Sequence, residues 1–389
     1  GNIPAAIKIV SGKIDHTLKM GKNSNLQSGW KSSHISTDNS ASYQKFDGTT
    51  WNEDYGKSNH FIYKENIHAL YSSLETKYKR FSMQGGLRYE YTAYDAHQLG
   101  NVIQKDSAFS RNYSGLFPSA AITYQADSSN GFTFTSGRRI DRPAFQKLNP
   151  FYTIINKYTY QTGNPFFLPQ YSWNLQLSHQ YKHVLTTSVS YSIIKNYFSQ
   201  LFLTDTVKNI LFYSEGNVGK AHNLGLSATL VVSPFKWWSL TAQANYNHKK
   251  LKGYNGNVNF TSEINQLNIN INNQFTIFKK YNAEVSGFYT TRARNDLQEV
   301  LYPTGQLSLG VSRQVLKKKG TLKFSARDIF YTNAMEGLTQ FDNATEYFIL
   351  RRDSRVFNLS FTYRFGKAYK TGKRTSGSAA DEIERAGNG

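Results

Sequence analysis

The feature that most constrains this chain is a strict alternation of apolar and polar residues along most of its length. In one stretch the apolar residues are Leu267, Ile269 and Ile271, with an asparagine at each position between them. Because successive side chains of a β-strand point to opposite faces, this period-two pattern predicts strands with one apolar and one polar face. The same pattern recurs in residues 173–181, 238–247 and 357–365. We therefore predict an all-β fold.

Many alternating runs exceed the ~5–6 residues usual for a strand and reach the ~9–11 residues with which a tilted strand crosses a bilayer. The polar positions are mostly Ser, Thr, Asn and Gln. No uninterrupted apolar run reaches the ~18 residues that a membrane-spanning helix needs. In lipid, only helices and closed barrels pair every backbone polar group. The pattern therefore predicts a transmembrane antiparallel β-barrel.

The connections alternate between short turns and long polar loops, as in outer-membrane barrels. They divide residues 14–365 into about fifteen strands. Because single-chain barrels have even strand numbers, we expect this chain to be the C-terminal portion of a larger barrel whose opening strands precede it. Residues 1–366 are assigned to the barrel. Residues 367–389 are charged and rich in Gly and Ser, which predicts a disordered periplasmic tail.

The 389 residues carry a net charge of +20 and no cysteine, which excludes disulfides and thiolate metal sites. Lysines and arginines recur in the short turns, where they either contact anionic lipid headgroups or simply keep the turns soluble. They do not line an aromatic groove, so we do not expect nucleic acid as a partner. The His residues are scattered, and no catalytic or nucleotide-binding motif occurs. We predict no enzyme activity, no metal and no cofactor.

Three arginines are candidate contacts to a ligand. Arg138, Arg139 and Arg142 lie where a strand runs into the longest loop. Guanidinium groups suit the carboxylates of a plug domain or of an anionic ligand. The alternative is that they pair with acids of the barrel wall, such as Glu90, and hold the wall in place.

Aromatic residues on two long loops are the second group of candidates. Trp51 and Tyr55 lie on one loop, and Tyr158 and Tyr160 on another. Flat rings stack on sugars and chelates, so exposed aromatics on loops can form ligand platforms. They can equally fold the loops onto one another or belong to an aromatic belt at the membrane surface.

Several local sequences resemble the barrel portion of TonB-dependent outer-membrane receptors, in particular a β-barrel family common in Bacteroidetes. The most specific is GRRIDRPAFQKLNPF at residues 137–151. Shorter similarities are LFPSAAITY at 116–124, GNPFFLP at 163–169, NVGKAHNLGL at 217–226, DIF at 328–330 and the final strand RVFNLSFTYRFG at 355–366. The matches extend from Leu116 to Gly366.

This resemblance implies a barrel of about 22 strands with a plugged lumen. It implies uptake of a scarce nutrient (an iron chelate, cobalamin or a glycan) driven by TonB. The implied partners are outer-membrane lipid, the plug and strands missing from the N-terminal side, TonB, and the barrel assembly machinery. That machinery would read Phe361, Tyr363 and Phe365 as the closing aromatic signal.

Two other functions stay open. A passive porin or structural barrel of the outer membrane would lack the plug, and an outer-membrane enzyme would need catalytic groups that converge at one strand level. A soluble β-rich protein is a minor further option.

Overall fold

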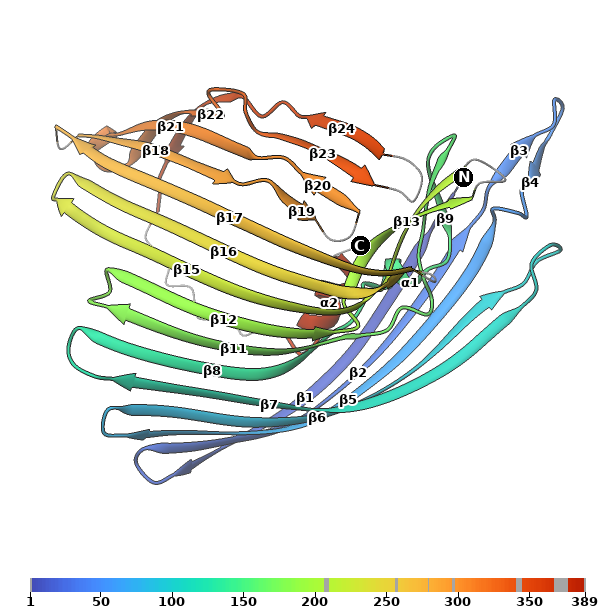
Figure 1. Cartoon of the computed structure of the whole chain (residues 1–389), viewed down its shortest axis with the longest axis horizontal. Helices are drawn as coiled ribbons and strands as arrows, with labels where there is room; N and C mark the ends of the chain where they lie inside the picture. The colour runs from blue at the N-terminus through green and yellow to red at the C-terminus, as the bar shows by residue number, and fades with distance from the viewer. Residues whose placement is uncertain are drawn as a thin grey trace.

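A computed structural model describes residues 2–205, 210–255, 258–278, 280–295, 298–340, 345–366 and 377–387. Its main feature is a 15-stranded sheet in which every strand pairs antiparallel with its neighbours (Figure 1). The strands, in spatial order, are β1 (Ala5–Met20), β2 (Ser24–Ala41), β5 (Asn59–Tyr78), β6 (Phe81–Leu99), β7 (Ser107–Gln125), β8 (Asn130–Asp141), β11 (Gln170–Tyr181), β12 (Leu185–Lys195), β15 (Gly219–Phe235), β16 (Trp238–Asn255), β17 (Val258–Ile277), β18 (Tyr281–Thr290), β21 (Thr304–Val315), β22 (Gly320–Arg327) and β25 (Val356–Tyr363). The predicted all-β fold and the strand count are confirmed.

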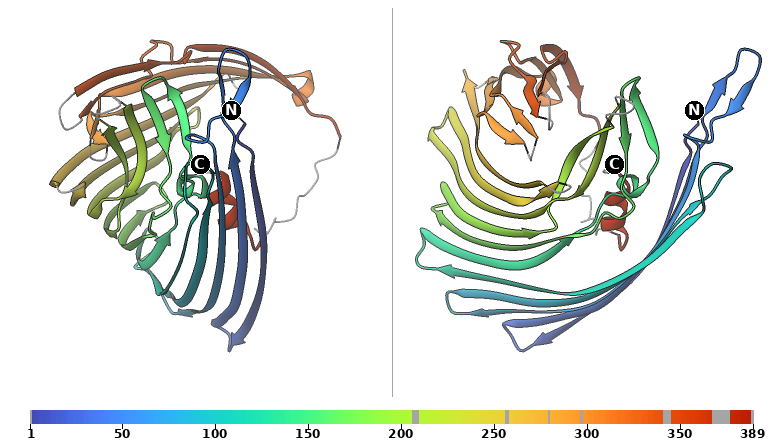
Figure 2. Two further views of the ribbon diagram at one scale, coloured as in Figure 1. Left: turned by 90° about the vertical axis from the view of Figure 1, so that its right-hand side faces the viewer. Right: turned by 45° about the vertical axis from the view of Figure 1, so that its right-hand side comes forward.

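The sheet curves into a trough with one concave and one convex face (Figure 2). Strands β1 and β25 form its two edges, and no pairing between them joins the described strands. Neighbouring strands are joined by short turns at one end, which we call the turn end; for example, only Lys79 and Arg80 separate β5 from β6.

The opposite end, the loop end, carries the long connections, which form three small sheets of their own. These are a hairpin of β3 (Gln44–Phe46) and β4 (Trp51–Glu53), a sheet of β13 (Phe198–Asp205), β14 (Ile210–Asn217), β10 (Thr159–Thr162) and β9 (Tyr152–Asn156), and a sheet of β19 (Ala293–Asn295), β20 (Glu299–Leu301), β23 (Ala334–Gln340) and β24 (Thr345–Arg351). The predicted alternation of short turns and long loops is therefore confirmed.

One row of paired residues shows how the alternation builds the convex face. Ile122, Phe134, Leu177, Val189 and Leu226 are register partners on five successive strands. All five side chains are exposed. Exposed aliphatic and aromatic side chains in a continuous row are the outer surface of a membrane barrel.

The residues that alternate with these along each strand build the concave face. Thr123 and Thr133 are hydrogen-bonded through their hydroxyls at 3.2 Å, and Ser188 and Ser227 at 2.6 Å. Polar side chains on this face thus satisfy one another across strands. The predicted two-faced strands are confirmed.

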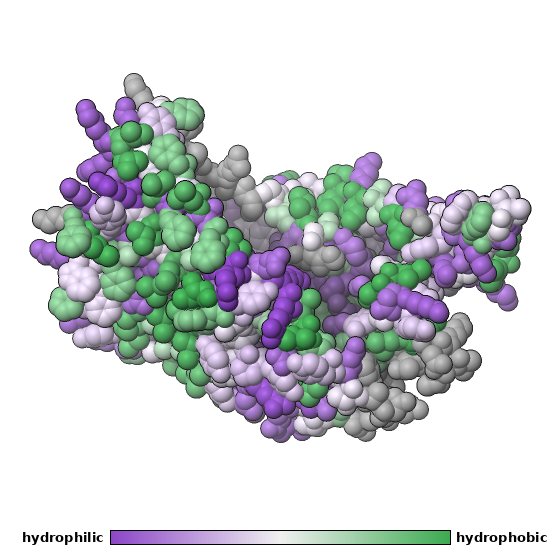
Figure 3. All heavy atoms as spheres, turned by 90° about the horizontal axis from the view of Figure 1, so that it is seen from above, coloured by the Kyte–Doolittle hydropathy of each residue, from purple (hydrophilic) through white to green (hydrophobic). Residues whose placement is uncertain are grey.

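Seen from above, hydrophobic side chains gather over the face that carries the last strands (Figure 3). Exposed residues there include Leu322 and Phe324 of β22 and Leu359 of β25. The apolar convex face therefore continues to the edge of the sheet.

The main buried cluster lies on the concave face toward the loop end. Strand residues Ile35, Phe61 and Tyr63 pack there with Phe145 and Leu148. The last two belong to α1 (Phe145–Leu148), a single helical turn that follows β8. The loop after β8 thus folds back over the strands instead of extending away from them.

Two further helical segments are described, a 3₁₀ turn at Leu316–Lys318 and helix α2 (Ala380–Gly387). The prediction of disorder for residues 367–389 is wrong for α2, which lies on the concave side of the sheet (Figure 2). Its charged side chains find buried partners there, which the composition of the tail did not indicate. Residues 377–379, which precede α2, are also described. Residues 367–376, 388 and 389 of the tail lie outside the described residues. None of the described helices combines the length and apolarity needed to cross a membrane.

Candidate functional site

The wall of the sheet splits where the candidate arginines lie. Strands β7 and β8 pair only from the turn end up to Ser119 and Gly137, beyond which β7 follows β6 and β8 follows β11. Arg138 bridges the split, because its Nη1 donates to the carbonyl oxygen of Leu116 at 2.9 Å. This bond satisfies a backbone acceptor that the ended ladder no longer pairs.

The same guanidinium lies over two rings. Its Cζ is 5.4 Å from the ring centroid of Phe117 and 5.1 Å from that of Tyr171, distances at which a cation is attracted to an aromatic face. Arg138 is therefore anchored in the wall on both sides of the split.

Arg142 joins β6 to β7 from the loop that follows β8. It donates to Tyr113 Oη at 3.0 Å and to Thr92 Oγ1 at 2.9 Å, and it forms an ion pair with Glu90. Glu90 also pairs with Arg88 at 2.6 Å. The interpretation that these arginines pair with wall acids such as Glu90 is confirmed for Arg142.

A cavity of about 580 Å³ adjoins these groups, and Arg139 lines it. The strands and the loop after β8 contribute four arginines and two carboxylates to its lining, so this side of the cavity is basic. The lining residues are Arg88, Glu90, Phe117, Arg138, Arg139, Ile140, Asp141, Arg142 and Ala144 from the wall, and Asp381, Glu384 and Arg385 from α2. The structure thus brings the three predicted arginines to one cavity; their contact with a ligand or plug stays a prediction.

Sequence reasoning missed Glu65 and Lys31, which lie on the same face beside this cavity and are both buried. Glu65 is 3.9 Å from Arg142 and 2.6 Å from Arg385 of α2. The sequence did contain a signal for Glu65. At the odd-numbered positions of residues 61–69, which form one face of the strand, Glu65 is the one charged residue and the others are apolar.

The segments that carry the family resemblance meet in this region. The backbone N–H groups of Gly163 and Asn164 donate to the carbonyl oxygens of Asn149 and Lys147, at 3.1 and 2.7 Å. An added Cβ at Gly163 would lie 2.2 Å from the Asn149 oxygen, so only glycine allows this approach. The GNPFFLP segment is therefore docked directly on the GRRIDRPAFQKLNPF segment.

A third resemblance segment joins them through Asn217. Its Oδ1 accepts from Leu168 N at 2.8 Å, and its Nδ2 donates to Leu168 O at 2.9 Å. The three motifs are thus parts of one packed unit, and the GRRIDRPAFQKLNPF segment within it also lines the arginine cavity.

The predicted aromatic residues do not form one platform. Trp51 is 66% exposed on the β3–β4 hairpin, where its ring lies 5.3 Å from that of Phe46, and Tyr55 is exposed beyond the hairpin. The hairpin turn is held by Asp47, whose carboxylate accepts from the backbone N–H groups of Thr50 and Thr49. Those bonds hold the pKa of Asp47 well below its usual value.

Tyr158 and Tyr160 lie in the separate β9–β10 region. Tyr158 is exposed, whereas Tyr160 packs 6.4 Å from Tyr152 and 5.9 Å from Phe212, centroid to centroid. Tyr160 therefore helps to fold the loop sheet, which was one of the two interpretations. Ligand contact by Trp51, Tyr55, Tyr158 and Tyr160 stays a prediction.

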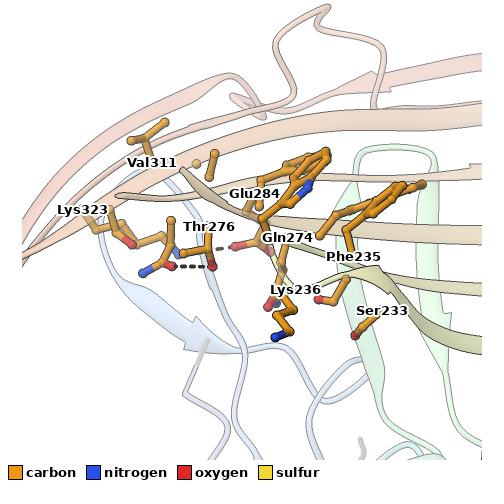
Figure 4. A pocket seen from close by; sticks show the side chains of 16 residues that line it. Ser233, Phe235, Lys236, Gln274, Thr276, Glu284, Val311 and Lys323 are labelled. Carbon is orange, nitrogen blue, oxygen red and sulfur yellow. Dashed lines mark hydrogen bonds and ion pairs between the residues drawn. The ribbon is translucent and has the colours of Figure 1, made fainter. Parts of the chain in front are cut away.

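A second cavity, of about 390 Å³, lies at the turn end (Figure 4). Glu284 lines it, accepting from Asn272 Nδ2 at 2.8 Å and lying 3.9 Å from Lys323. Its charges are fewer than those of the arginine cavity, and none of the resemblance segments forms it. We therefore take the arginine cavity as the candidate site.

The predicted assembly signal is exposed: Phe361 and Tyr363 lie on the edge strand β25, and Phe365 lies just beyond its end. Their recognition by the assembly machinery stays a prediction. Across the described residues, no group of three or more His, Asp or Glu side chains is arranged to hold a metal ion.

Residues 1–363 match the profile of the outer membrane protein beta-barrel family. No match is found among curated proteins.

Three solved structures are similar in fold. The ferric yersiniabactin uptake receptor FyuA from Yersinia pestis has a TM-score of 0.66 and 13% identity, over 94% of this chain and 55% of its own. The siderophore receptor PiuA from Acinetobacter baumannii has a TM-score of 0.65 and 10% identity, over 93% and 56%. The copper transporter OprC has a TM-score of 0.67 and 12% identity, over 93% and 57%.

The chain thus spans about half the length of the receptors that it resembles. The sequence match covers nearly every residue, and the two-faced antiparallel sheet is the fold that such a match requires. The chain belongs to the outer membrane protein beta-barrel family and forms a multi-pass β-barrel of the outer membrane.

Proposed function

We propose that this chain is the C-terminal barrel portion of a TonB-dependent receptor that takes up a scarce nutrient. An N-terminal plug within the barrel would transmit the energy supplied by TonB. The observation that carries the proposal is the 15-stranded sheet, which superposes on receptors and a transporter over more than nine-tenths of its length.

The basic cavity favours an anionic ligand over a neutral one. Arg88, Arg138 and Arg142 have partners in the wall, whereas Arg139 is exposed and lines the cavity, where its guanidinium suits bidentate contact with carboxylate or phosphate oxygens. Among the nutrients considered, an iron chelate with carboxylate groups fits better than cobalamin or a neutral glycan. Of the proteins with a similar fold, FyuA is a ferric yersiniabactin uptake receptor and PiuA is a siderophore receptor, which supports this choice.

Within this proposal, Arg139 contacts the ligand or plug, while Arg138 and Arg142 hold the wall that presents it. Trp51, Tyr55 and Tyr158, which are exposed at the loop end, are the ring surfaces that a ligand meets first. Phe361, Tyr363 and Phe365 direct assembly, and lipid covers the convex face.

A passive porin or structural barrel is the second candidate, and an outer-membrane enzyme the third. The proteins with a similar fold include an uptake receptor and a copper transporter, which argues against an enzyme.

The test is uptake by the complete gene product in its own host. We expect accumulation of a ⁵⁵Fe-labelled carboxylate chelate to fall at least tenfold on deletion of the gene, and equally after addition of a protonophore. Labelled cyanocobalamin and a labelled oligosaccharide serve as the competing substrates. Uptake that is unaffected by the protonophore would indicate a diffusion pore instead of a TonB-dependent receptor. Hydrolysis of the oligosaccharide would indicate an enzyme.

A further inference from the structure

Strand β7 has a free backbone edge at the loop end of the sheet. On one side, β7 pairs with β6 in an unbroken register from Ser107 to Tyr124. On the other side, β8 pairs with β7 only as far as Ser119. Among the described strands, residues 107–118 therefore have no partner on the side of β8, where the two strands diverge (Figure 1).

The even-numbered residues direct their backbone groups to this free edge. Successive residues of a strand direct their N–H and C=O groups to alternate sides. Leu116 O accepts from Arg138 of β8 at 2.9 Å, whereas Gln125 N donates toward the β6 side, to Arg80 O, at 2.9 Å. Because the register with β6 has no bulge, the even-numbered residues of 108–114 point the same way as Leu116.

A proline explains why the ladder between β7 and β8 ends where it does. Pro118 is the residue of β7 that follows Ser119 toward the loop end, and its even number places its nitrogen on the β8 side. Proline has no N–H, so it cannot donate to a ladder on that side. On the other side, Pro118 stays paired with Leu87 of β6. The sequence thus ends one ladder and leaves the other intact.

Side chains at the base of the split hold β7 and β8 apart. The rings of Phe117 and Tyr171 have centroids 6.5 Å apart and planes within 6° of each other, and the Arg138 guanidinium lies over both. Further pairing of β8 with β7 would have to displace these groups. The free edge is therefore a fixed feature of the wall.

The free edge is open to solvent. Ala108, Ser110, Asn112 and Ser114 are all exposed, and so is Arg111 between them. Within the described parts of the chain, the backbone groups of the four even-numbered residues have no hydrogen-bond partner. An exposed strand edge of this kind is a template for another strand unless proline, charge or a covering segment blocks it. None of the four carries a charge or is a proline.

The side chains of the edge define the strand that fits it. Arg111 lies between Phe109 and Tyr113, which are half-buried and share its face of the strand. The even-numbered positions of 110–114 carry only Ser and Asn on the other face. Directly opposite residues of paired strands interact, and opposite charges favour pairing. The matching strand therefore has an acidic residue opposite Arg111, apolar residues two positions away on either side, and polar residues between.

A second copy of this chain in the same membrane does not fit the edge. Antiparallel pairing of two identical edges needs a two-fold axis perpendicular to the sheet. The sheet is the wall around the barrel axis, so that rotation would turn the second copy upside down relative to the membrane. The occupant must therefore be a segment of a different molecule.

We propose that the β7 edge, residues 108–114, binds an extended acidic segment of a partner protein outside the cell by strand addition. Main-chain bonds supply affinity in this mode, and alternate side chains supply selectivity. The long connections of outer-membrane barrels face outside the cell, so the partner reaches the edge from there. An added strand lies in the plane of the wall and leaves the lumen to the plug. The inference goes beyond the proposed function and does not depend on it.

The probe is a blocked, fluorescein-labelled peptide of sequence TVTETVT, which in antiparallel register places Glu opposite Arg111 and Val opposite Phe109 and Tyr113. Its binding to the complete gene product in detergent micelles is followed by fluorescence anisotropy. We expect saturable binding, at least tenfold tighter than that of the same peptide with Lys in place of Glu. Arg111→Glu should reverse this preference. Equal affinities of the wild-type protein for the two peptides would overturn the acidic partner.

Methylated peptides test the backbone bonds without altering the protein. N-methylation of the inner Thr residues removes the N–H groups that face β7, and it should weaken binding at least tenfold. N-methylation of the Val residues removes N–H groups that face away, and it should leave the affinity within threefold. Equal losses with the two methylated peptides would overturn strand addition.

A matched pair of variants tests the same bonds from the side of the protein. Asn112→Pro removes an N–H that points to the free edge and should weaken binding at least tenfold, whereas Asn112→Ala should leave it within twofold. Because the Asn112 N–H makes no bond to β6, the urea midpoint of Asn112→Pro should stay that of the wild type. Unchanged peptide affinity in Asn112→Pro would contradict the proposal.

The oligomeric state separates the proposed partner from a second copy. The protein should sediment as a monomer without peptide, both as wild type and as Asn112→Pro. A wild-type dimer that becomes monomeric in Asn112→Pro would assign the edge to a second copy, and the proposed partner would be wrong. None of these readouts depends on transport, so a failed uptake experiment does not decide them.

Discussion

At the scale of single residues, Arg142 is the side chain on which the candidate site depends most. It is 11% exposed and contacts Glu90, Thr92 and Tyr113 from two strands. A buried carboxylate that loses a partner retains its desolvation cost, so such a site is sensitive to truncation.

We expect Arg142→Ala to lower the free energy of unfolding by about 3 kcal/mol, the cost of removing one partner from a buried ion pair. Urea unfolding in lipid vesicles, followed by tryptophan fluorescence, measures the change. Arg139→Ala is the control, because Arg139 lines the same cavity but is exposed; its effect should stay within about 0.5 kcal/mol. A loss no larger than that of the control would mean that the wall network contributes no stability.

At the scale of elements, different interactions order the strands and the loops. The strands follow from the alternation, because one face contacts lipid and the other faces the polar interior. The loop after β8 is ordered instead by backbone contacts between segments that the sequence separates, such as Gly163 with Asn149.

Gly163→Ala should lower the free energy of unfolding by about 1–3 kcal/mol, because the new methyl group meets backbone oxygens that cannot move independently. The nearest two are the carbonyl oxygens of Asn149 and Lys147, at 2.2 and 2.8 Å from the added carbon. Gly310→Ala, whose added carbon would have no neighbour closer than 3.8 Å, is the matched control and should be neutral or slightly stabilising. Limited proteolysis of the loop end would report the same change locally. If both variants unfold alike, the close approach at Gly163 does not constrain the loop.

At the scale of the whole molecule, the sheet separates lipid from a polar interior. Leu226 and Ser227 are neighbours on β15 but belong to opposite faces. The same substitution at the two positions therefore compares the two environments directly.

Leu226→Arg should destabilise the folded barrel in lipid by about 2–4 kcal/mol, whereas a charge on the interior face is tolerated far better. Ser227→Arg should cost only about 1 kcal/mol, for the lost hydroxyl bond to Ser188. Refolding yield and urea midpoint in phospholipid vesicles distinguish them. A larger loss for Ser227→Arg would reverse the assignment of the faces.

The sequence by itself determined the all-β fold, the strand count, the two faces and the short and long connections. Each of these features depends on residues that are close together in the sequence. The period-two pattern of apolar and polar side chains therefore reveals it directly. It also indicated the arginines around residues 138–142 and named Glu90 as a partner.

Only the tertiary structure decided which contacts these residues make. Arg385 meets Glu65 across 320 positions of sequence, and no local pattern carries information at that separation. The same holds for α2, whose charged composition predicts disorder when its partners are unknown. Burial against Lys31, Glu65 and Phe145 supplies the interactions that order it.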